Sequence, residues 1–332
     1  MRWRRRPREG APVSRAIRPR QHGGPEVLTV VDVPTPRAGA GEVVVRVRAA
    51  GVNPIDWKLY GGAFHDVDDD QRAEAGMTEA LPTLGLECSG VVVEIGADVR
   101  DVVVGEEVVV YPVTAAYADH VVAPPSSLIP RPAALGEEEA AGLMLAGTTA
   151  AHALHAVGAG AGDTVLVHGG SGGVGLMAVQ LAGIAGATVV ATASDRNHEV
   201  LRGLGAIPVA HGPGLADRIR AAAPRGIDAA VDTVGTDEAL DVSVELVADR
   251  GRIASITGSD RRADAGIRLL GYGPGQDAGT EYRASVRQTL ADHAGAGRLR
   301  VRIAGTFALA DAADAHRFAR RSHAPGKVVL VP

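Results

Sequence analysis

Hydrophobic and polar residues alternate in short runs along the first third of the chain, which is the pattern of strands with one buried face. Glu42–Ala50 places charged residues between apolar ones with a period of two, and the apolar run Val27–Val33 is closed by Pro34. Two further apolar runs, Gly90–Gly96 and Glu107–Tyr111, lie beside turn-forming residues. Short strands separated by Gly and Pro predict a compact, barrel-like β domain.

The pattern changes near Leu135, where helical periodicity begins and then alternates with near-continuous apolar runs. The acidic residues Glu137–Glu139 occupy the first turn of an expected helix over residues 137–154, where the helix dipole favours them. We expect strands over 164–168, 187–192, 207–210, 227–232 and 251–256, and helices over 173–185, 197–204, 215–223 and 237–247. This alternation predicts the α/β class, with a parallel sheet covered by helices on both faces. A last strand over 326–331 is expected to return to the N-terminal domain.

Residues 64–81 are acidic and poor in apolar side chains. The clustered carboxylates suggest a metal site, but the segment lacks the glycine and the spacing of a calcium loop. A solvated loop or lid is therefore the favoured interpretation.

Composition narrows the class of partner. The chain has 332 residues, of which 46% are hydrophobic and 22% charged, as in an ordinary globular protein with room for two domains. Its net charge of -5 leaves no basic excess to neutralise phosphates, so nucleic acid is not expected as a partner. The single cysteine, Cys88, excludes a disulfide within the chain and a zinc site built on several thiolates. No apolar run is long enough for a membrane span.

The first residues are rich in arginine, and two interpretations are open. The cluster could be an arm that binds nucleic acid or another anionic surface, or it could be a disordered extension, for example from an upstream start codon. One short basic run favours the extension. No apolar stretch follows it, so no secretory signal is expected and the location is taken as cytoplasmic.

A glycine-rich turn carries the strongest chemical signal. Gly170, Gly172 and Gly175 match the dinucleotide pattern, and they follow one expected strand and open one expected helix. The first glycine would permit the tight turn, the second would let the backbone approach a pyrophosphate, and the third would let helix and strand pack closely. The N–H groups at the helix start would then bind the pyrophosphate.

The end of the second strand bears on the choice between NAD and NADP. Asp195 has the spacing of the acid that binds a ribose 2′-hydroxyl in NAD sites. Thr192 and Ser194 are small hydroxyl residues that leave room for a phosphate, and Arg196 would supply its charge-assisted contact. We favour NADPH over NADH, although Arg196 could be a solvated residue and Asp195 a helix cap.

Taken together, the motifs identify a family. Ala50–Lys58, Leu84–Val92 and Ala116–Val121 precede the glycine turn, and Val231–Gly235 and Gly326–Leu330 follow it. With Ala146–Ala150 these segments make the chain resemble the medium-chain dehydrogenase/reductase superfamily, in particular its zinc-free quinone oxidoreductase branch. The resemblance implies a GroES-like β-barrel domain over 16–130 and 290–332 and a Rossmann domain with a doubly wound parallel sheet over 131–289. It also implies a cleft for nicotinamide and substrate, and a homodimer. Residues 1–15 lie outside it.

The resemblance also predicts the absence of zinc. The zinc-dependent members have a cysteine where this chain has Asn53 and a histidine where it has Leu86, and neither residue here is a plausible zinc ligand. His152 and His155 lie three residues apart on an expected helix and could form a metal pair, but packed or solvated histidines are favoured.

The candidate site residues follow from the same motifs. Asn53 is expected to orient the nicotinamide or a substrate oxygen, Lys58 to donate to a substrate carbonyl or a cofactor phosphate, and Tyr60 to donate a proton. Each has a structural alternative, since Asn53 before Pro54 could serve a turn and Lys58 could be solvated. Asp56 is expected to order its loop. The expected cofactor-binding residues are Asn53, Thr149, Gly170, Ser171, Gly172, Gly173, Val174, Gly175, Ser194, Arg196, Val234, Gly235 and Thr257.

The function expected from these features is zinc-independent reduction of a quinone or an enone with NADPH. Without a Lewis acid, oxidation of a simple alcohol is difficult, whereas a conjugated acceptor spreads its charge over an oxygen that hydrogen-bond donors can stabilise. Two alternatives remain open. One is an enoyl-thioester reductase. If its substrate is carried by an acidic protein, the acidic segment 64–81 argues against this alternative. The other is an NADPH-binding regulatory protein with little turnover.

Overall fold

The computed structural model describes residues 13–63, 81–321 and 324–332, which form two compact units. The first unit runs to Leu145 and resumes at Ile303 and again at Lys327, and the second runs from Ala146 to Arg302. The expected lid over 64–81 and the Arg-rich start lie outside the described residues, apart from Leu81 and the last three residues of 1–15.

The second unit is built on a six-stranded parallel sheet in the order β10-β9-β8-β11-β12-β13. The strands are β8 (Thr164–His168), β9 (Thr188–Ala193), β10 (Ile207–Ala210), β11 (Ala229–Asp232), β12 (Ile253–Ser255) and β13 (Arg268–Leu269). Counted along the chain this is the 3-2-1-4-5-6 order of a Rossmann sheet, so the predicted fold class is confirmed.

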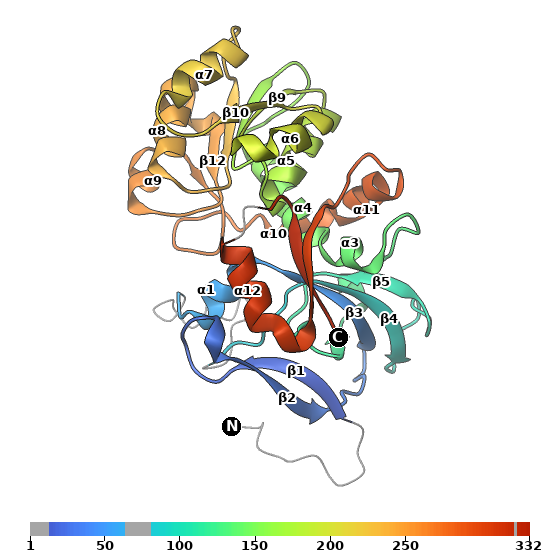
Figure 1. Cartoon of the computed structure of the whole chain (residues 1–332). Coiled ribbons are helices and arrows are strands. Elements are labelled where there is room, and N and C mark those ends of the chain that lie inside the picture. Colours follow the sequence, from blue (N-terminus) through green and yellow to red (C-terminus); the bar gives the residue numbers. More distant parts are fainter. Residues whose placement is uncertain (1–12, 64–80, 322–323) are drawn as a thin grey trace. The chain divides into compact units, whose positions relative to one another are not determined.

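Helices cover both faces of this sheet, as the apolar strands predict. They are α4 (Met144–Ala156), α5 (Gly173–Ile184), α6 (His198–Gly203), α7 (Leu215–Ala222), α8 (Asp237–Leu246), α9 (Asp260–Asp264), α10 (Thr280–Ser285) and α11 (Arg287–Gly295), with 3-10 turns η3 (Asp195–Asn197) and η4 (Arg250–Arg252). In Figure 1, α5 and α6 lie on one side of the strands and α7 and α8 on the other. On the α7 and α8 side, Leu215, Ile219 and Leu240 pack against the buried Leu166 and Val190 of the sheet.

The first unit is the GroES-like barrel. Its strands are β1 (Val13–Pro19), β2 (Leu28–Pro34), β3 (Val43–Val52), β4 (Cys88–Ile95), β5 (Glu107–Val110), β6 (His120–Ala123), β7 (Leu128–Pro130), β14 (Ile303–Ala308) and β15 (Lys327–Val331). They form a sheet in the order β14-β15-β3-β4-β5-β7 with β6 also paired to β3, and a β1–β2 ribbon. The expected return of the last strand is confirmed, because β15 pairs with β3.

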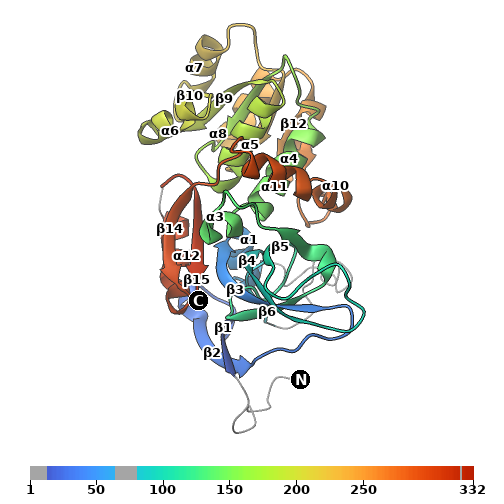
Figure 2. The same cartoon turned by 90° about the vertical axis from the view of Figure 1, so that its right-hand side faces the viewer.

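The described residues of this unit also form the helices α1 (Pro54–Tyr60), α3 (Glu137–Ala141) and α12 (Ala312–Arg321), with 3-10 turns η1 (Pro25–Val27), η2 (Pro125–Ser127) and η5 (Leu309–Asp311). Figure 2 shows α12 beside β14 and β15. The buried Ala312 and Ala315 of this helix join the barrel core, together with Tyr60 and Tyr117.

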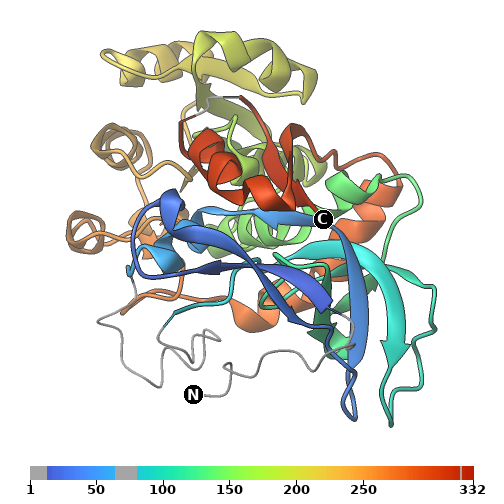
Figure 3. The same ribbon diagram turned by 60° about the horizontal axis from the view of Figure 1, so that its bottom comes forward.

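Strand β1 corrects the expected extension over 1–15. Val13–Arg15 belong to this strand, whose antiparallel pairing with β2 is drawn in the darkest blue in Figure 3. Ser14 is buried and its hydroxyl lies 2.8 Å from Nδ1 of His120, while Arg15 forms an ion pair with Asp119. The alternation of β1 is hard to see in the sequence, because the exposed Val13 is apolar, the buried Ser14 is polar, and Ala16 and Ile17 are buried in succession.

Two further expectations need correction. The single helix over 137–154 is broken between α3 and α4, with Gly142 ending α3. The continuous part of the Rossmann unit runs from Ala146 to Arg302, whereas the expected domain covers 131–289. Helix α3 stays with the barrel because it packs on β3 and β4. The segment after α11 belongs to the Rossmann unit, because the Gln180 side chain forms two hydrogen bonds with the backbone of Arg300. Its Nε2 donates to the Arg300 carbonyl at 3.0 Å, and its Oε1 accepts the Arg300 N–H at 2.8 Å.

Candidate cofactor and catalytic sites

The glycine turn between β8 and α5 has the geometry that a pyrophosphate site requires. A Cβ at Gly175 would lie 2.1 Å from the carbonyl oxygen of Gly169, so only glycine lets the helix approach the turn this closely. The left-handed residue is Gly169, with φ of 73°, rather than the expected Gly170, whose missing side chain instead admits Ala191 of β9. No side chain caps α5, and its first turn carries no acidic residue. Its first N–H groups therefore suit an anion.

A buried histidine, His168, connects the elements next to this turn through hydrogen bonds. Nε2 of His168 lies 3.1 Å from the Ser243 hydroxyl, which itself donates to the Ala239 carbonyl, so the histidine is the donor in this pair. On the other side, the Thr192 hydroxyl lies 3.5 Å from Nδ1 and accepts the N–H of Gly169. Burial lowers the pKa of His168 to about 4, and the ring is neutral at physiological pH. The neutral ring thus connects β8, β9 and α8 beneath the turn.

The carboxyl ends of β9 and β10 lie side by side. The register pairs Ala193 with Ala210, and the next residues, Ser194 and His211, meet with 3.3 Å between the hydroxyl oxygen and Nε2. The side chains of Asp195 and Arg196 are exposed. His211 is not among the site residues expected from the sequence. It directly follows an expected strand that lies next to β9, and this position is the signal that could have revealed it.

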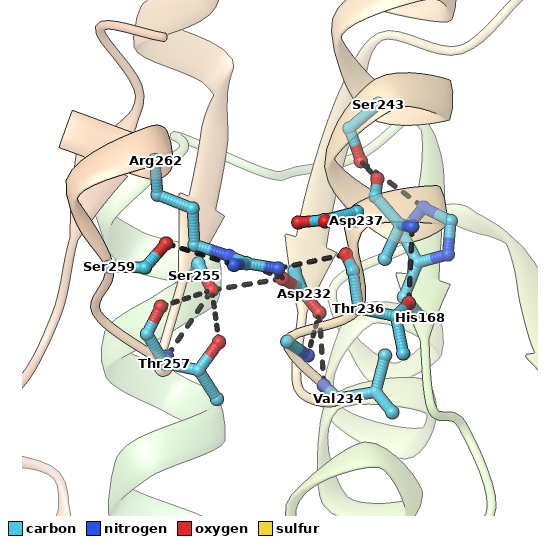
Figure 4. A network of polar contacts seen from close by, with 12 residues as sticks. His168, Asp232, Val234, Thr236, Asp237, Ser243, Ser255, Thr257, Ser259 and Arg262 are labelled. Atoms are coloured by element: carbon cyan, nitrogen blue, oxygen red, sulfur yellow. Dashed lines mark hydrogen bonds and ion pairs between the residues drawn. The ribbon is translucent and has the colours of Figure 1, made fainter. Parts of the chain in front are cut away.

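The loops after β11 and β12 contain the expected residues Val234, Gly235 and Thr257. Both oxygens of the buried Asp232 organise them. One oxygen accepts the N–H groups of Val234 at 2.9 Å and Gly235 at 2.8 Å. The other accepts the Ser255 hydroxyl at 3.0 Å, and that hydroxyl also accepts the N–H of Thr257. Figure 4 shows how this single carboxylate connects the two loops.

Arg262 of α9 completes this network, and the sequence analysis gave it no role. Its guanidinium lies 3.3 Å from Asp232 and donates to the Thr236 carbonyl at 2.8 Å and to the Ser259 hydroxyl at 3.1 Å. The Arg262 and Asp232 side chains are 4% and 2% exposed. No pattern in the sequence points to this pairing, because α9 is short and thirty residues separate the partners.

Helix α4 contributes Thr149, which is buried. One turn later, His152 lies 3.1 Å from Asp277 and 3.4 Å from Nε of Arg283, and burial lowers its pKa. His155 stacks on Tyr282 with ring centroids 4.0 Å apart. Both histidines thus have packing partners, the interpretation that the sequence analysis favours over a metal pair.

In the barrel unit, Asn53 lies at the start of α1 rather than in an open loop, and it is buried. Its Nδ2 donates to Glu87 at 2.9 Å and to the Gly51 carbonyl at 3.3 Å, and its Oδ1 accepts a hydrogen bond from Lys327. Lys327 also donates to Glu87 at 3.0 Å, and the second oxygen of Glu87 accepts the N–H of Leu145 at 2.8 Å. Both amide N–H groups of Asn53 are therefore used within the barrel, which leaves acceptor capacity only on Oδ1.

Tyr60 belongs to a second internal chain. Its hydroxyl lies 3.1 Å from Nδ1 of His316, whose Nε2 lies 3.2 Å from the Tyr117 hydroxyl, which donates to Asp56 at 2.7 Å. Burial raises the pKa of Tyr60 to about 12 and that of Asp56 to about 6, and it lowers the pKa of His316 to about 4. Lys58, on the same helix, has an exposed side chain.

Asp56 fulfils its expected loop-ordering role. Its carboxylate accepts the backbone N–H groups of Asn53 at 2.9 Å and of Gly85 at 3.2 Å, in addition to the Tyr117 hydroxyl. It thereby fixes the start of α1 against the segment that precedes β4.

Within residues 13–63, 81–321 and 324–332, no group of three or more His, Cys, Asp or Glu side chains could hold a metal ion. Over the same ranges, no helix combines the length and the apolar character that crossing a bilayer requires.

Two family models match the chain. Residues 39–158 match "Alcohol dehydrogenase GroES-like domain", and residues 204–330 match "Zinc-binding dehydrogenase". The first covers most of the barrel strands, and the second begins at the end of α6 and continues into β15. Asn53 and Leu86, where the zinc-dependent members have ligands, lie outside the second match.

Similar proteins span most of the chain. A phenolphthiocerol/phthiocerol polyketide synthase of Mycobacterium tuberculosis is 32% identical over 93% of this chain, which spans only 14% of that synthase. The 2-haloacrylate reductase of a Burkholderia species is 31% identical over 93% of this chain and 96% of its own length.

Several solved structures are also similar to this chain over most of its length. The quinone oxidoreductase of Coxiella burnetii has a TM-score of 0.80 at 31% identity, covering 97% of this chain and 100% of its own. Mycobacterial Rv1454c complexed with NADPH has a TM-score of 0.81 at 29% identity, over 96% and 100%. The JamJ enoyl reductase has a TM-score of 0.82 at 26% identity, over 96% and 99%. The chain therefore belongs to the medium-chain dehydrogenase/reductase superfamily, in its quinone oxidoreductase branch.

Proposed function

We propose that this oxidoreductase uses NADPH, without zinc, to reduce a carbon–carbon double bond conjugated to a carbonyl, or a quinone. The observation that carries the proposal is the uncapped start of α5 behind a turn that only glycine fits, next to a second-strand end that has the Ser194 hydroxyl, an arginine and a histidine. Such a turn suits a pyrophosphate, and such a strand end suits an additional phosphate.

The preference for NADPH rests on the surroundings of Ser194. Its hydroxyl and the His211 ring form one polar patch, and the exposed Arg196 follows within two residues. Asp195, the residue that argues for NAD, has a side chain that is 85% exposed and lies 3.7 Å from His198. An NADPH complex of the similar Rv1454c agrees with this proposal.

When bound, the nicotinamide would supply a hydride to the acceptor. The chain's own groups would bind and orient. We propose that Thr149 and the loops of Val234, Gly235 and Thr257 hold the nicotinamide half, and that Lys58, with its exposed side chain, donates a hydrogen bond to the substrate oxygen. Asn53 could accept a hydrogen bond from the cofactor or substrate only through its Oδ1 atom. Tyr60 would release a proton only through His316, which lies against its hydroxyl.

A second candidate substrate is an enoyl thioester. The similarity of 93% of the chain to part of a polyketide synthase favours it, and so does the likeness to an enoyl reductase structure. Enones, enoyl thioesters and 2-haloacrylate share an activated double bond next to a carbonyl, so the same hydride acceptor geometry serves all three.

Initial rates of NADPH oxidation with matched quinones, enones and enoyl thioesters test the proposal. We expect turnover with at least one class, a preference for NADPH over NADH, and no loss of rate with a chelator. Strong inhibition by the chelator would contradict zinc independence, and no oxidation with any acceptor would favour the regulatory alternative. A homodimer and a cytoplasmic location stay predictions.

A further inference from the structure

We propose that Arg262 is a positioning residue for the nicotinamide half of the cofactor. The inference rests on the proposed dinucleotide function and adds a residue outside the glycine turn and its neighbouring strands. Arg262 would act through Asp232 and the two loops, without touching the cofactor.

The contacts of Arg262 connect separate segments of the sheet's carboxyl edge. Nη2 reaches the carbonyl of Thr236 in the loop after β11, and Nη1 reaches Ser259 in the loop after β12. Nε faces Asp232 at the end of β11, at 3.3 Å. One planar group therefore sets the spacing between both loops, and Figure 4 shows it lying between them.

Asp232 transmits this position to the backbone. Because one of its oxygens is fixed by Arg262 and Ser255, the other can hold the N–H groups of Val234 and Gly235 in one orientation. Gly235 has a φ of 79°, and a Cβ there would lie 2.5 Å from the Thr257 hydroxyl. Because Gly235 has no side chain, its backbone can lie directly against the Thr257 side chain, and the two loops meet at this point.

The strand order assigns these loops to the nicotinamide half. A Rossmann sheet has two mononucleotide-binding halves, and the end of its second strand binds the adenosine ribose. Here the second strand is β9, so the adenosine half falls on the side of β9 and β10, where Ser194 and His211 lie. Strands β11 and β12 continue the sheet on the other side of β8 and so serve the other nucleotide.

Lysine cannot replace this arginine. The guanidinium offers donors in a fixed planar fork, which here serves three partners, whereas an ammonium is a point charge on a flexible stem. The Arg262→Lys variant keeps the charge beside Asp232 but loses the fork that connects the two loops. It should weaken the nicotinamide half of the site alone.

The test compares two ligands on one variant. Dissociation constants for NADPH and for 2′,5′-ADP, which carries only the adenosine half, are measured by calorimetry on wild type and Arg262→Lys. We expect NADPH to bind about tenfold or more weakly, as for loss of charge-assisted hydrogen bonds, and 2′,5′-ADP to change less than about twofold. A general loss of structure would weaken both ligands, so the difference separates positioning from folding.

Arg252→Lys is the matched control. Arg252 also uses its whole fork, on the carbonyls of Val157 and Gly158 and on Asp163, 2.7 Å away. This pair lies at the amino edge of the same sheet, since its members directly precede β8 and β12. We expect both ligands to bind Arg252→Lys as they bind wild type.

The outcomes separate the two proposals. If wild type binds neither ligand, the proposed function fails. Two results would overturn the inference alone, provided that wild type binds both ligands. In the first, Arg262→Lys keeps its affinity for NADPH. In the second, folded Arg262→Lys binds both ligands equally more weakly. If Arg262→Lys does not fold, Ser259→Ala decides, because it removes the partner of Nη1 in the loop after β12 and leaves Arg262 in place. Unchanged NADPH affinity in Ser259→Ala would then overturn the inference, and a selective loss would support it.

Discussion

At the scale of single residues, His211 and Arg196 offer a test of cofactor choice. Both lie at the strand end where Ser194 would meet a 2′-phosphate. We expect His211→Ala and Arg196→Ala each to raise the KM for NADPH about tenfold and to leave the KM for NADH nearly unchanged, because only NADPH carries the phosphate. Steady-state kinetics with both cofactors measures this ratio.

The control for these two variants is Arg202→Ala. Arg202 is an exposed arginine of α6 that pairs with Glu199. It should leave the ratio of the two KM values unchanged. An equal rise of both KM values in His211→Ala would show that the ring supports the loop rather than the phosphate.

A second residue-scale prediction concerns the buried pair of Lys327 and Glu87, whose side chains are 6% and 0% exposed. Lys327→Met leaves the Glu87 carboxylate buried without its cation, and we expect it to lower the free energy of unfolding by about 3–5 kcal/mol. Adding Glu87→Gln removes the orphaned charge and should restore part of the loss. Urea denaturation of the single and double variants measures both effects, and a double variant less stable than Lys327→Met would refute this account.

At the scale of elements, two of the glycines of helix α5, Gly175 and Gly183, differ in the space around their missing side chains. Gly175→Ala would place its methyl carbon 2.1 Å from the Gly169 carbonyl oxygen, so the helix must shift and the turn must open. We expect it to weaken NADPH binding at least about tenfold. Gly183, on the same helix, has nothing within 4 Å of its missing Cβ.

Gly183→Ala is therefore the matched control. It should stabilise the protein by about 0.5–1 kcal/mol, because alanine has the higher helix propensity, and leave NADPH binding unchanged. Thermal melts and cofactor titrations of both variants give the result. Wild-type affinity in Gly175→Ala would mean that the turn does not need the close approach.

The elements show which patterns in a sequence are informative. Strand β8 has the expected bounds, because a buried parallel strand is a continuous apolar run bounded by polar or glycine residues. Strand β10 also has the expected bounds, although it is an edge strand in which only Val209 is buried. Strand β1 was not predicted, since its exposed Val13 is apolar and its buried Ser14 is polar. Asn53 and Asp56 were assigned to a loop, whereas the structure has helix α1 there, with Pro54 at its first position. Proline is favoured at the first helical position. Between Thr257 and His323 the sequence predicts a domain boundary but no helix or strand, although β13, β14 and short helices lie there.

At the scale of the molecule, the candidate site was predictable only where its residues share a local motif. The glycine turn is contiguous in sequence, so its spacing predicts its geometry. The partners of Asp232 and Asn53 are Arg262 and Lys327, which are 30 and 274 residues away. Folding brings such pairs together through strand order and helix packing, which a single sequence does not reveal. His211 lies between these cases, since the parallel pairing of two expected strands places it beside Ser194.

Acid should affect the two units differently, because each buries a different set of titratable groups. In the Rossmann unit, burial lowers the pKa of His168 to about 4 and also lowers the pKa of His152. A lowered histidine pKa contributes stability that is present above the unfolded value near 6.5 and is lost as the pH falls through the folded value. This unit should lose stability between pH 6.5 and pH 4, on the order of a few kcal/mol.

The barrel unit contains His120, whose pKa is lowered by burial, and in addition an opposing pair. His316, with a pKa of about 4, also loses its contribution as the pH falls. Asp56 acts in the other direction, because its folded pKa of about 6 is above the unfolded value of 3.8, so its contribution is lost as the pH rises and regained on acidification. The two groups are joined through Tyr117 and offset each other over the same range. The barrel should therefore resist mild acid better than the Rossmann unit.

Hydrogen exchange at pH 7 and pH 4.5, corrected for intrinsic rates, resolves the units separately. We expect protection in β8, β9 and β11 to fall more than protection in β3 and β4. The Asp56→Asn variant removes the opposing titration while an amide oxygen can still accept from Gly85, so acid should then lower protection in the barrel as well. Equal acid sensitivity of the two units in wild type would contradict the offset between Asp56 and His316. Unchanged barrel protection in Asp56→Asn would instead assign the resistance to other groups.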